Sequence, residues 1–265
     1  MDWIKRLLGS SAKPTPLAGF SITFANDQTR LAVRVPPHAD ADSILQALQL
    51  PYPTPTIVIS GGAGFMDTGL LNLNRTVIED GLARFLDKRS ISLIDGGTSV
   101  GAMLLIGVAR HRRGYTFPLV GVAPEKLVAY PGGAQPEAQA ALDANHSHFV
   151  LTSGDQFGAE SATIINLAYA LSGSGAHKRL MLVINGGEIV KREAHRVSTQ
   201  NPRFPLLVLE GSGRFADELA ASNKTGSSDS LIQDILKHGD VYFVSIKAGA
   251  DNLYHWLENF FGYTY

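Results

Sequence analysis

The sequence contains no cysteine, which excludes disulfide bonds, thiolate zinc sites, iron–sulfur clusters and cysteine nucleophiles. It also lacks an excess of positive or negative charge: 23 Lys and Arg residues are balanced by 24 Asp and Glu residues, and the formal net charge is −1. Such a balance does not favour a phosphate backbone as partner, so we expect no binding of nucleic acid. No apolar run approaches the ~18 residues of a membrane span, and no secretory signal opens the chain. We therefore expect a soluble, cytoplasmic protein without a membrane span.

Glycine is the residue that the sequence has in excess. It accounts for 27 of 265 residues, about a tenth of the chain against a usual ~7%. Hydrophobic residues make up 45% and charged residues 18% of the chain, a composition that fits a folded domain and excludes disorder. The place of the glycines in the fold is therefore the first question for function.

Short apolar runs that end in small or turn-forming residues recur along the chain. They predict seven buried strands, at Ile57–Ser60, Ile91–Asp95, Leu119–Ala123, Phe149–Thr152, Leu180–Asn185, Leu206–Glu210 and Val241–Ile246. Segments of helical period lie between most of them, at Leu70–Leu86, Thr98–Arg110, Gly158–Leu171 and Glu188–Val197. Near-continuous apolar strands that alternate with helices predict an α/β fold, a Rossmann-like three-layer sandwich with a mostly parallel sheet of about seven strands.

Residues 1–50 are predicted to form an N-terminal extension, and residues 51–265 the main domain. The extension begins with a short helix. Two alternating runs, Phe20–Phe24 and Leu31–Val35, then predict a β-hairpin, and a second helix follows at Asp42–Leu50. Prolines at the start of the main domain make a stiff spacer, because each one biases the residue before it away from helix. We expect the hairpin to be an accessory piece outside the main sheet.

Five loops after the predicted strands contain twelve of the glycines. The residues of interest in them are Gly61, Gly62, Ala63 and Gly64; Gly96, Gly97, Thr98 and Ser99; Ser153, Gly154 and Asp155; Gly186, Gly187 and Glu188; and Gly211, Ser212, Gly213 and Arg214. The carboxyl ends of parallel strands meet at one edge of the sheet, where such folds bind ligands. Glycine lets a ligand approach the backbone, and the helix that follows offers unpaired N–H groups to a phosphate. A single loop is equally well explained as a tight turn, but five such loops share one edge.

Arg214 is the cation that points most directly to a ligand. It falls in the first turn of a predicted helix, where a positive charge opposes the helix dipole and costs about 0.3–1 kcal/mol unless an anion offsets it. A bound phosphate or carboxylate would provide that anion. The alternative is an ion pair with Asp217, three residues later, worth a few tenths of a kcal/mol. Residues 211–216 match a dinucleotide fingerprint, but no acidic residue ends the next strand, so we do not expect a hydride-transferring dehydrogenase.

Three carboxylates, Asp155, Glu160 and Glu188, lie at or just beyond the predicted strand ends. Each is a candidate for binding ribose hydroxyls or for activating water as a catalytic residue, and capping of a helix is the alternative role. His146 and His148 precede a strand, but no cysteine or clear third ligand accompanies them, so we expect structural histidines and no metal. The sequence has neither a P-loop nor a nucleophile elbow. We expect no required cofactor.

In their order along the chain, the segments over residues 57 to about 220 resemble the SLOG superfamily. The resemblance is to its prokaryotic ligand-sensing branch, LSDAT, which is related to the cytosolic N-terminal domain of melastatin-type TRP channels. Residues 96–103 resemble the family's glycine-glycine-threonine-x-x-glycine-x-methionine block, and residues 211–217 resemble its glycine-serine-glycine-arginine-x-x-aspartate block. The resemblance implies a sensor or binding domain for a nucleotide-derived ligand, with ADP-ribose-like and NAD-derived molecules the favoured class.

An enzymatic branch of the same superfamily, the cytokinin-activating phosphoribohydrolases, carries a proline-glycine-glycine-x-glycine-threonine-x-x-glutamate block. Here no proline precedes Gly96 and no glutamate follows Thr98 at the matching place. A binding protein is therefore our first hypothesis and a nucleotide N-glycosidase or phosphoribohydrolase the second. The third is a structural module whose glycines serve turns and oligomer contacts. Aromatic residues crowded into the last dozen positions suggest that the C-terminal helix packs on the core or on another subunit, which leaves a homo-oligomer open.

Overall fold

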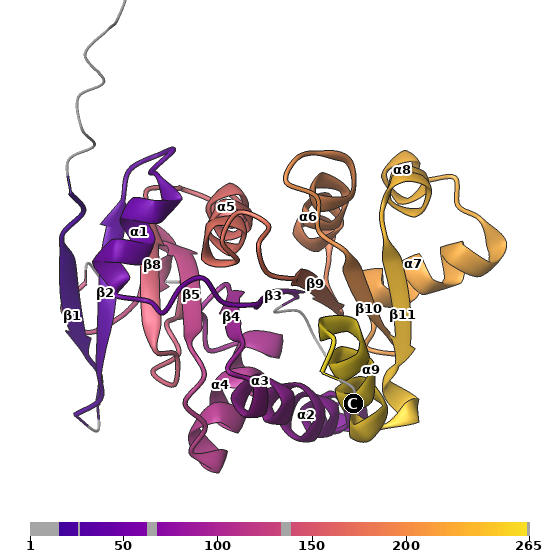
Figure 1. The fold of residues 1–265 in the computed structure, drawn as a ribbon, viewed down its shortest axis with the longest axis horizontal. Helices are drawn as coiled ribbons and strands as arrows, with labels where there is room; N and C mark the ends of the chain where they lie inside the picture. The colour runs from indigo at the N-terminus through magenta and orange to yellow at the C-terminus, as the bar shows by residue number, and fades with distance from the viewer. Residues whose placement is uncertain (1–15, 26, 63–67, 134–138, 264–265) are drawn as a thin grey trace, which may run out of the picture.

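The computed structural model describes residues 16–25, 27–62, 68–133 and 139–263, which fold around a nine-stranded sheet (Figure 1). Its strand order is β1-β2-β8-β5-β4-β3-β9-β10-β11. The strands are β1 (Gly19–Thr23), β2 (Thr29–Val35), β3 (Thr56–Gly61), β4 (Ser92–Asp95), β5 (Leu119–Pro124), β8 (His148–Thr152), β9 (Arg179–Ile184), β10 (Leu206–Glu210) and β11 (Val241–Ser245). All neighbours run parallel except β1 and β2. The predicted α/β, Rossmann-like fold is confirmed.

The seven strands predicted for the main domain are present, with bounds within one residue of the prediction. The predicted hairpin is also present, but it is not an accessory piece. Its second strand pairs in parallel with β8, Leu31 opposite His148 through Val35 opposite Thr152, so the hairpin extends the main sheet from seven strands to nine. Buried apolar residues on β2, Ala32 and Val33 among them, explain why it belongs to the core. The domain boundary at residue 50 stays a prediction.

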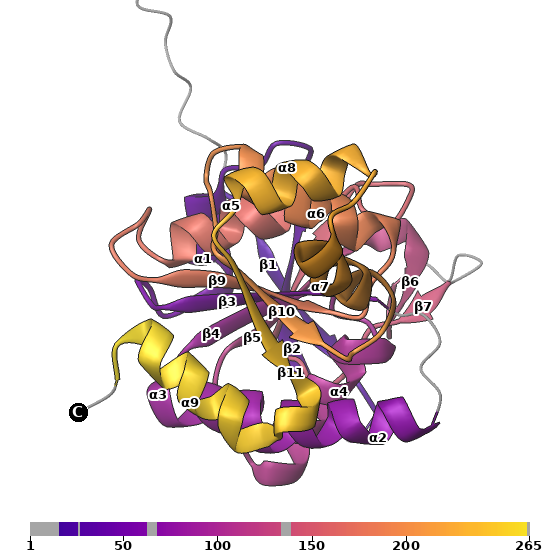
Figure 2. The ribbon, with the colours of Figure 1, turned by 90° about the vertical axis from the view of Figure 1, so that its right-hand side faces the viewer.

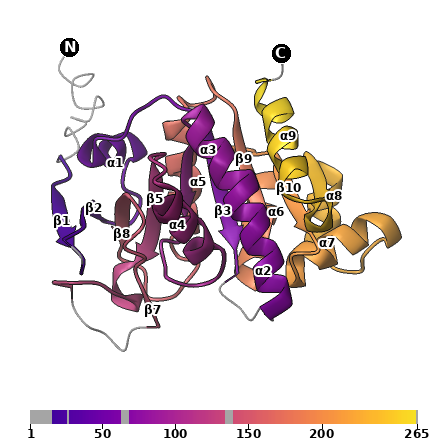
Figure 3. The ribbon, with the colours of Figure 1, turned by 90° about the horizontal axis from the view of Figure 1, so that it is seen from below.

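Helices cover both faces of the sheet and complete the three layers (Figure 2). One layer consists of α1 (Ala41–Leu48), α5 (Ser161–Leu171), α6 (Glu188–Thr199), α7 (Arg214–Thr225) and α8 (Ser230–His238). The other, seen from below in Figure 3, consists of α2 (Thr68–Thr76), a π-helix η2 (Val77–Ala83), α3 (Arg84–Arg89), α4 (Gly101–Arg113) and α9 (Ala250–Phe261). Short elements complete the chain: η3 (Glu125–Leu127), β6 (Val128–Ala129), β7 (Ala140–Ala141) and η4 (Ile246–Ala248).

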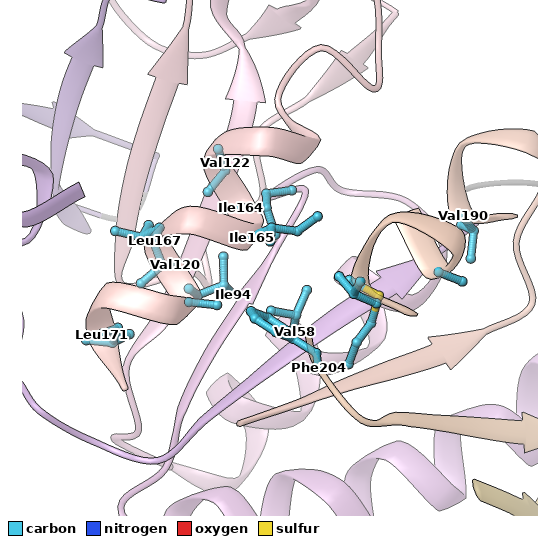
Figure 4. Close-up of a cluster of buried hydrophobic side chains, with 14 of the residues drawn as sticks. Val58, Ile94, Val120, Val122, Ile164, Ile165, Leu167, Leu171, Val190 and Phe204 are labelled. Carbon is cyan, nitrogen blue, oxygen red and sulfur yellow. The ribbon is translucent and has the colours of Figure 1, made fainter. Parts of the chain in front are cut away.

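Alternate residues of the central strands divide the core into two clusters, because successive side chains of a strand point to opposite faces. On β3, Val58 packs with Val120 of β5 and Ile164 of α5 on one face (Figure 4), whereas Ile57 and Ile59 pack on the other. Full burial of such a side chain contributes about 1.5–3 kcal/mol relative to exposure. Burial on both faces explains the near-continuous apolar runs of the sequence.

The direction in which the chain adds strands reverses between β3 and β9. From β3 it proceeds outward through β4, β5 and β8, and it then returns to place β9 on the other side of β3. The two strands pair over Thr56–Gly61 and Arg179–Ile184, a junction that we call the β3–β9 seam. In open α/β sheets, ligands bind at the carboxyl ends of the strands beside such a reversal.

The C-terminal helix packs on the protein's own core. Tyr254 and Phe261 are buried, and their rings lie 6.0 and 5.6 Å from that of Phe85 in α3. On the outer side, Trp256 stacks on Phe260 at 5.3 Å next to the sheet edge. Self-association through this end of the sheet stays a prediction. Among the described residues, no helix combines the length and the apolar character needed to cross a bilayer.

Candidate functional site

A cleft of about 640 Å³ lies at the carboxyl ends of β3, β4 and β9, across the β3–β9 seam. The predicted site residues that line it are Gly61, Gly62, Gly96, Thr98, Glu160, Gly187, Glu188 and Arg214. They come from four of the five predicted loops and from the start of α5. The structure therefore brings most of the glycine-rich edge together around one hollow.

Two pairs of glycines let the loops approach each other closely. A Cβ atom on Gly62 would lie 2.9 Å from the Cα of Gly186, so the loops after β3 and β9 touch through their backbones. Behind the cleft, Gly97 has a φ of +66°, and a Cβ on Gly121 of β5 would lie 2.5 Å from its Cα. Larger residues would push these loops apart, so the shape of the cleft depends on the four glycines.

Three long helices begin at or beside the cleft without a side-chain cap. Their N-cap residues are Val100 for α4, Gly187 for α6 and Gly213 for α7, and none supplies a capping hydrogen bond. Away from the cleft, α1 and α8 are capped by Asp40 and Asp229, whereas α9, which follows Gly249, also lacks a side-chain cap. At α7, the N–H groups of Phe215 and Ala216 donate to the carbonyls of Gly186 and Asn185, so they are not available to a ligand. The uncapped N–H groups of α4 and α6 and the positive ends of the helix dipoles suit an anion.

Arg214 is the exposed cation of the cleft. It makes no ion pair or side-chain hydrogen bond with any residue in the described part of the chain, although its guanidinium lies against Gly187, where a Cβ would be 2.7 Å from Nη2. Asp217 instead accepts the backbone N–H of Gly211 at 2.5 Å. The φ of Arg214 is +47°, which is unusual for a residue with a side chain. A strained, unpaired cation beside two uncapped helices indicates an anion site.

Several supporting loop residues lie behind the lining. The hydroxyl of Ser212 accepts the backbone N–H of Asn185 at 2.8 Å and so ties the loop after β10 to the loop after β9. Gly97, Gly186 and Gly213 all have positive φ and shape the loops without lining the cleft. These residues hold the lining in place.

Other predicted site residues are not brought to the cleft. Ser153 and Asp155 are exposed and do not line it, and Gly154 packs against Ala159 in a turn. The hydroxyl of Ser99 donates to the carbonyl of Leu142 at 3.2 Å. Gly211 and Asp217 border a separate hollow of about 440 Å³. Ala63 and Gly64 lie outside the described residues.

Glu193 of α6 lines the cleft and was missed from the sequence. It accepts hydrogen bonds from the hydroxyl of Ser60, at the end of β3, and from that of Ser161 at 2.5 Å. Its spacing in the sequence could have revealed it. Glu193 falls three residues after Val190 and four before Val197, both buried, so it lies on the same face of α6. An acid in the first turn of a helix is explained by the helix dipole. An acid on the buried, apolar face of a helix is uncommon and calls for another explanation.

Glu160 is the second acid of the cleft and is 7% exposed. Burial raises the pKa of Glu160 to about 7, although its own backbone N–H and that of Gly158, which donates to Oε2 at 2.8 Å, act in the opposite direction. The charge of Glu193 raises this pKa further. Burial also raises the pKa of Glu193 against the effect of its two hydroxyl donors. Neither acid forms a salt bridge with a described residue, so no cation offsets their burial, and the charge of one disfavours ionisation of the other.

Apolar residues that were not predicted also line the cleft. They include Val100, Met103, Phe157, Ile164 and Ile189, the last of which is 41% exposed. Ligand sites are commonly mostly apolar with a few convergent polar groups that fix orientation. The lining of this cleft combines both kinds of residue.

His146 supports the loop after β4 from beneath. Its Nε2 lies 2.8 Å from Asp95 Oδ1 and its Nδ1 lies 3.1 Å from Asp143 Oδ2, and all three residues are buried. Burial alone would lower the pKa of His146, but the two carboxylates outweigh it and raise the pKa to about 9. Asp95 also accepts the N–H of Gly97 at 2.7 Å, which links the imidazolium to the glycine loop. Within the described ranges, no group of His, Asp and Glu could hold a metal ion.

Comparison with known proteins identifies the family of the chain. The profile of the family described as "SLOG in TRPM, prokaryote" matches residues 54–254. A Transient receptor potential channel from Caenorhabditis elegans is 24% identical over 229 residues. That match covers 76% of the chain and 11% of the channel, so the chain spans a small part of this relative's length.

Proposed function

Because the chain belongs to the family of prokaryotic SLOG domains of the kind found in TRPM, we propose that it senses a nucleotide-derived small molecule bound in the cleft. ADP-ribose-like and NAD-derived molecules are the favoured class. The observation that carries the proposal is the unpaired Arg214 beside the uncapped starts of α6 and α7. A terminal or bridging phosphate there would offset the cation and accept from the backbone N–H groups at the start of α6.

The remaining lining fits the rest of such a ligand. A base would pack on apolar lining residues such as Phe157 and Ile189. Among the three carboxylates expected to bind a ribose, Glu160 is the one buried in the cleft. Glu188 borders the cleft but is exposed and paired with Arg192 at 3.0 Å, and Asp155 lies outside the lining.

A cytoplasmic location and the independence of any resident cofactor belong to the same proposal. Their support is indirect. A cysteine-free chain is compatible with a reducing compartment, and the cleft combines polar and apolar groups suited to an organic ligand. A balanced charge also argues against nucleic acid as the partner.

A thermal-shift experiment tests the proposal. Wild type, Arg214→Ala and Arg203→Ala are heated with ADP-ribose, NAD, ADP or AMP; Arg203 is exposed and does not line the cleft, so it serves as the matched control. A ligand at 100 times its Kd adds ~2.7 kcal/mol of stability. We expect a shift in wild type and in the control that is lost in Arg214→Ala. Absence of a shift with all four compounds would overturn the proposal, and an equal shift in Arg214→Ala would remove Arg214 from the site.

The Glu160–Glu193 pair also supports a second candidate function, hydrolysis of an N-glycosidic bond. A carboxyl group with a pKa near 7 can donate a proton to a leaving base, and a second carboxylate can accept one from water. Product analysis distinguishes turnover from binding. If NAD or AMP yields free base with wild type and with Glu188→Gln but not with Glu160→Gln, the enzyme prevails. If the nucleotide stays intact after long incubation, hydrolysis is rejected and binding without turnover is the function that remains.

A further inference from the structure

We propose that Glu160 and Glu193 together form a recognition site for the vicinal hydroxyl groups of the ligand's sugar, so that the cleft selects a ribonucleotide over its dideoxy analogue. The inference rests on the proposed function, because it assumes that a phosphate occupies the Arg214 end of the same cleft. It assigns a role to Glu193 and makes the two acids act as a unit.

The two carboxyl groups come from opposite sides of the β3–β9 seam and meet in the cleft. Glu160 directly precedes α5, whereas Glu193 lies in the second turn of α6. Ser161, the neighbour of Glu160 in the chain, donates to Glu193 at 2.5 Å, and Ser60 donates to the other oxygen. The hydroxyl donors fix the Glu193 carboxyl at the floor of the cleft.

The carboxyl group of Glu160 keeps acceptor capacity for a ligand, because Gly158 is the one other residue in the described part of the chain that donates to it. Its Oε2 accepts the N–H of Gly158 at 2.8 Å, but its other oxygen forms no hydrogen bond with another residue in the described part of the chain. The side chain is 7% exposed and lines the cleft. A buried carboxyl group without a cation is costly, and in a ligand site the missing hydrogen bond is one that the ligand can supply.

The chemistry of the pair fits a diol. A protonated carboxyl group can donate and an ionised one can accept, and each hydroxyl of a pentose does both. A second phosphate or a carboxylate at this place would face two acids and be repelled. The cation Arg214 and the acids Glu160 and Glu193 line the same cleft and favour different parts of a ligand, so together they orient it.

Titration calorimetry with two probes tests the inference. ADP and 2′,3′-dideoxy-ADP share their base and phosphates and differ only in the hydroxyl groups. We expect wild type to bind ADP on the order of 10–100-fold more tightly, because the analogue leaves buried polar groups unpaired. In Glu193→Gln and in Glu160→Gln this ratio should fall toward one through weaker binding of ADP. Asp251→Asn, which changes an exposed acid of α9 that does not line the cleft, should keep the wild-type ratio.

The outcomes separate this inference from the proposed function. If wild type binds both probes equally and Arg214→Ala weakens both, the phosphate site stands and the diol site is overturned. If wild type binds neither probe, the proposed function fails together with the inference. The comparison of the two probes on wild type needs no variant, so a folding defect in Glu193→Gln cannot obscure the result. Equal weakening of both probes by a folded Glu193→Gln would also overturn the diol site.

Discussion

Asp217 accepts the backbone N–H of Gly211 at 2.5 Å and leaves Arg214, three residues earlier on α7, without an ion pair to any described residue. The interpretation that Asp217 neutralises Arg214 is therefore wrong. Asp217 stabilises the turn that enters α7, while Arg214 carries its charge into the cleft at a φ of +47°. The two residues of one motif therefore differ: Asp217 bonds to the backbone of its own loop, and Arg214 lines the cleft.

The first prediction concerns the conflict between stability and binding at Arg214. Replacement by glycine relieves the positive φ, of order 1 kcal/mol, and removes a cation from a helix N-terminus, worth about 0.3–1 kcal/mol. We expect Arg214→Gly to raise the free energy of unfolding by about 1 kcal/mol and to weaken nucleotide binding at least tenfold. Denaturant unfolding and calorimetry measure the two effects. A less stable Arg214→Gly would show that the native contacts of Arg214 support the fold.

The second prediction assigns Asp217 to the fold. Asp217→Ala removes the acceptor of the Gly211 N–H, and loss of such a bond costs about 1–2 kcal/mol. We expect this decrease in the free energy of unfolding from urea denaturation. Glu218→Ala, at the next and more exposed position, is the control and should change stability by less than ~0.5 kcal/mol. Equal effects of the two variants would contradict the assignment.

The third prediction follows from the raised pKa of Glu160. The folded protein holds this proton up to a pKa of about 7, whereas the ordinary value is 4.5, so the contribution of Glu160 to stability is present below pH 4.5 and is lost as the pH rises through 7. Glu160→Gln cannot ionise. We expect it to be more stable than wild type at pH 8, by up to about 3 kcal/mol, and the difference to disappear near pH 4. A difference that is constant across this range would be evidence against the assignment.

The fourth prediction concerns the charged His146. Its pKa of about 9 lies above the ordinary 6.5, so its contribution is complete below pH 6.5 and is lost as the pH rises through 9. His146→Gln leaves Asp95 and Asp143 without the imidazolium and should cost about 3–5 kcal/mol at pH 6, and less at pH 10. His148→Gln is the control. Burial lowers the pKa of His148 to about 4, with help from Arg110 and Arg30, so between pH 6 and 10 only its unfolded state titrates and its effect should change by less than about 1 kcal/mol.

The fifth prediction compares two glycines of similar chemistry. A Cβ on Gly121 would meet the backbone of Gly97 at 2.5 Å, whereas a Cβ on Gly96 would meet nothing nearer than Met103 Cε at 3.9 Å. We expect Gly121→Ala to destabilise the protein by about 1–3 kcal/mol and Gly96→Ala to be tolerated. Thermal unfolding of the unliganded variants gives the comparison. The reverse order would mean that the loop after β4 can move away from β5.

The strands could be predicted because a strand that is buried on both faces consists of successive apolar residues, which are visible in the sequence. The sheet position of β2 could not, since its pairing with β8 joins residues more than a hundred positions apart. Helix α8 was not among the predicted helices. Helix α4 begins at Gly101, three residues later than predicted, because the backbone of Gly97 to Ser99 is used to reach neighbouring loops.

The same distinction holds for the site. Glycine loops are visible in the sequence, but which of them meet depends on strand order, and the loop after β8 lies three strands away from β3. Ser153 and Asp155 therefore do not line the cleft, although Glu160 reaches it from the start of α5. Glu193 was missed because only carboxylates near predicted strand ends were considered. Its place on the buried stripe of α6 carried the information.

The β3–β9 seam joins stretches of chain that lie about 120 residues apart, and it is held by strand pairing and by the bonds of Glu193 to Ser60 and Ser161. A ligand across the cleft would contact Arg214 and Glu193 on one side and Gly62 and Glu160 on the other. Such a ligand would contact both halves of the sheet and would make their separation less favourable. The rigidity of the protein would then depend on the concentration of the ligand, without any change in the shape of the two halves.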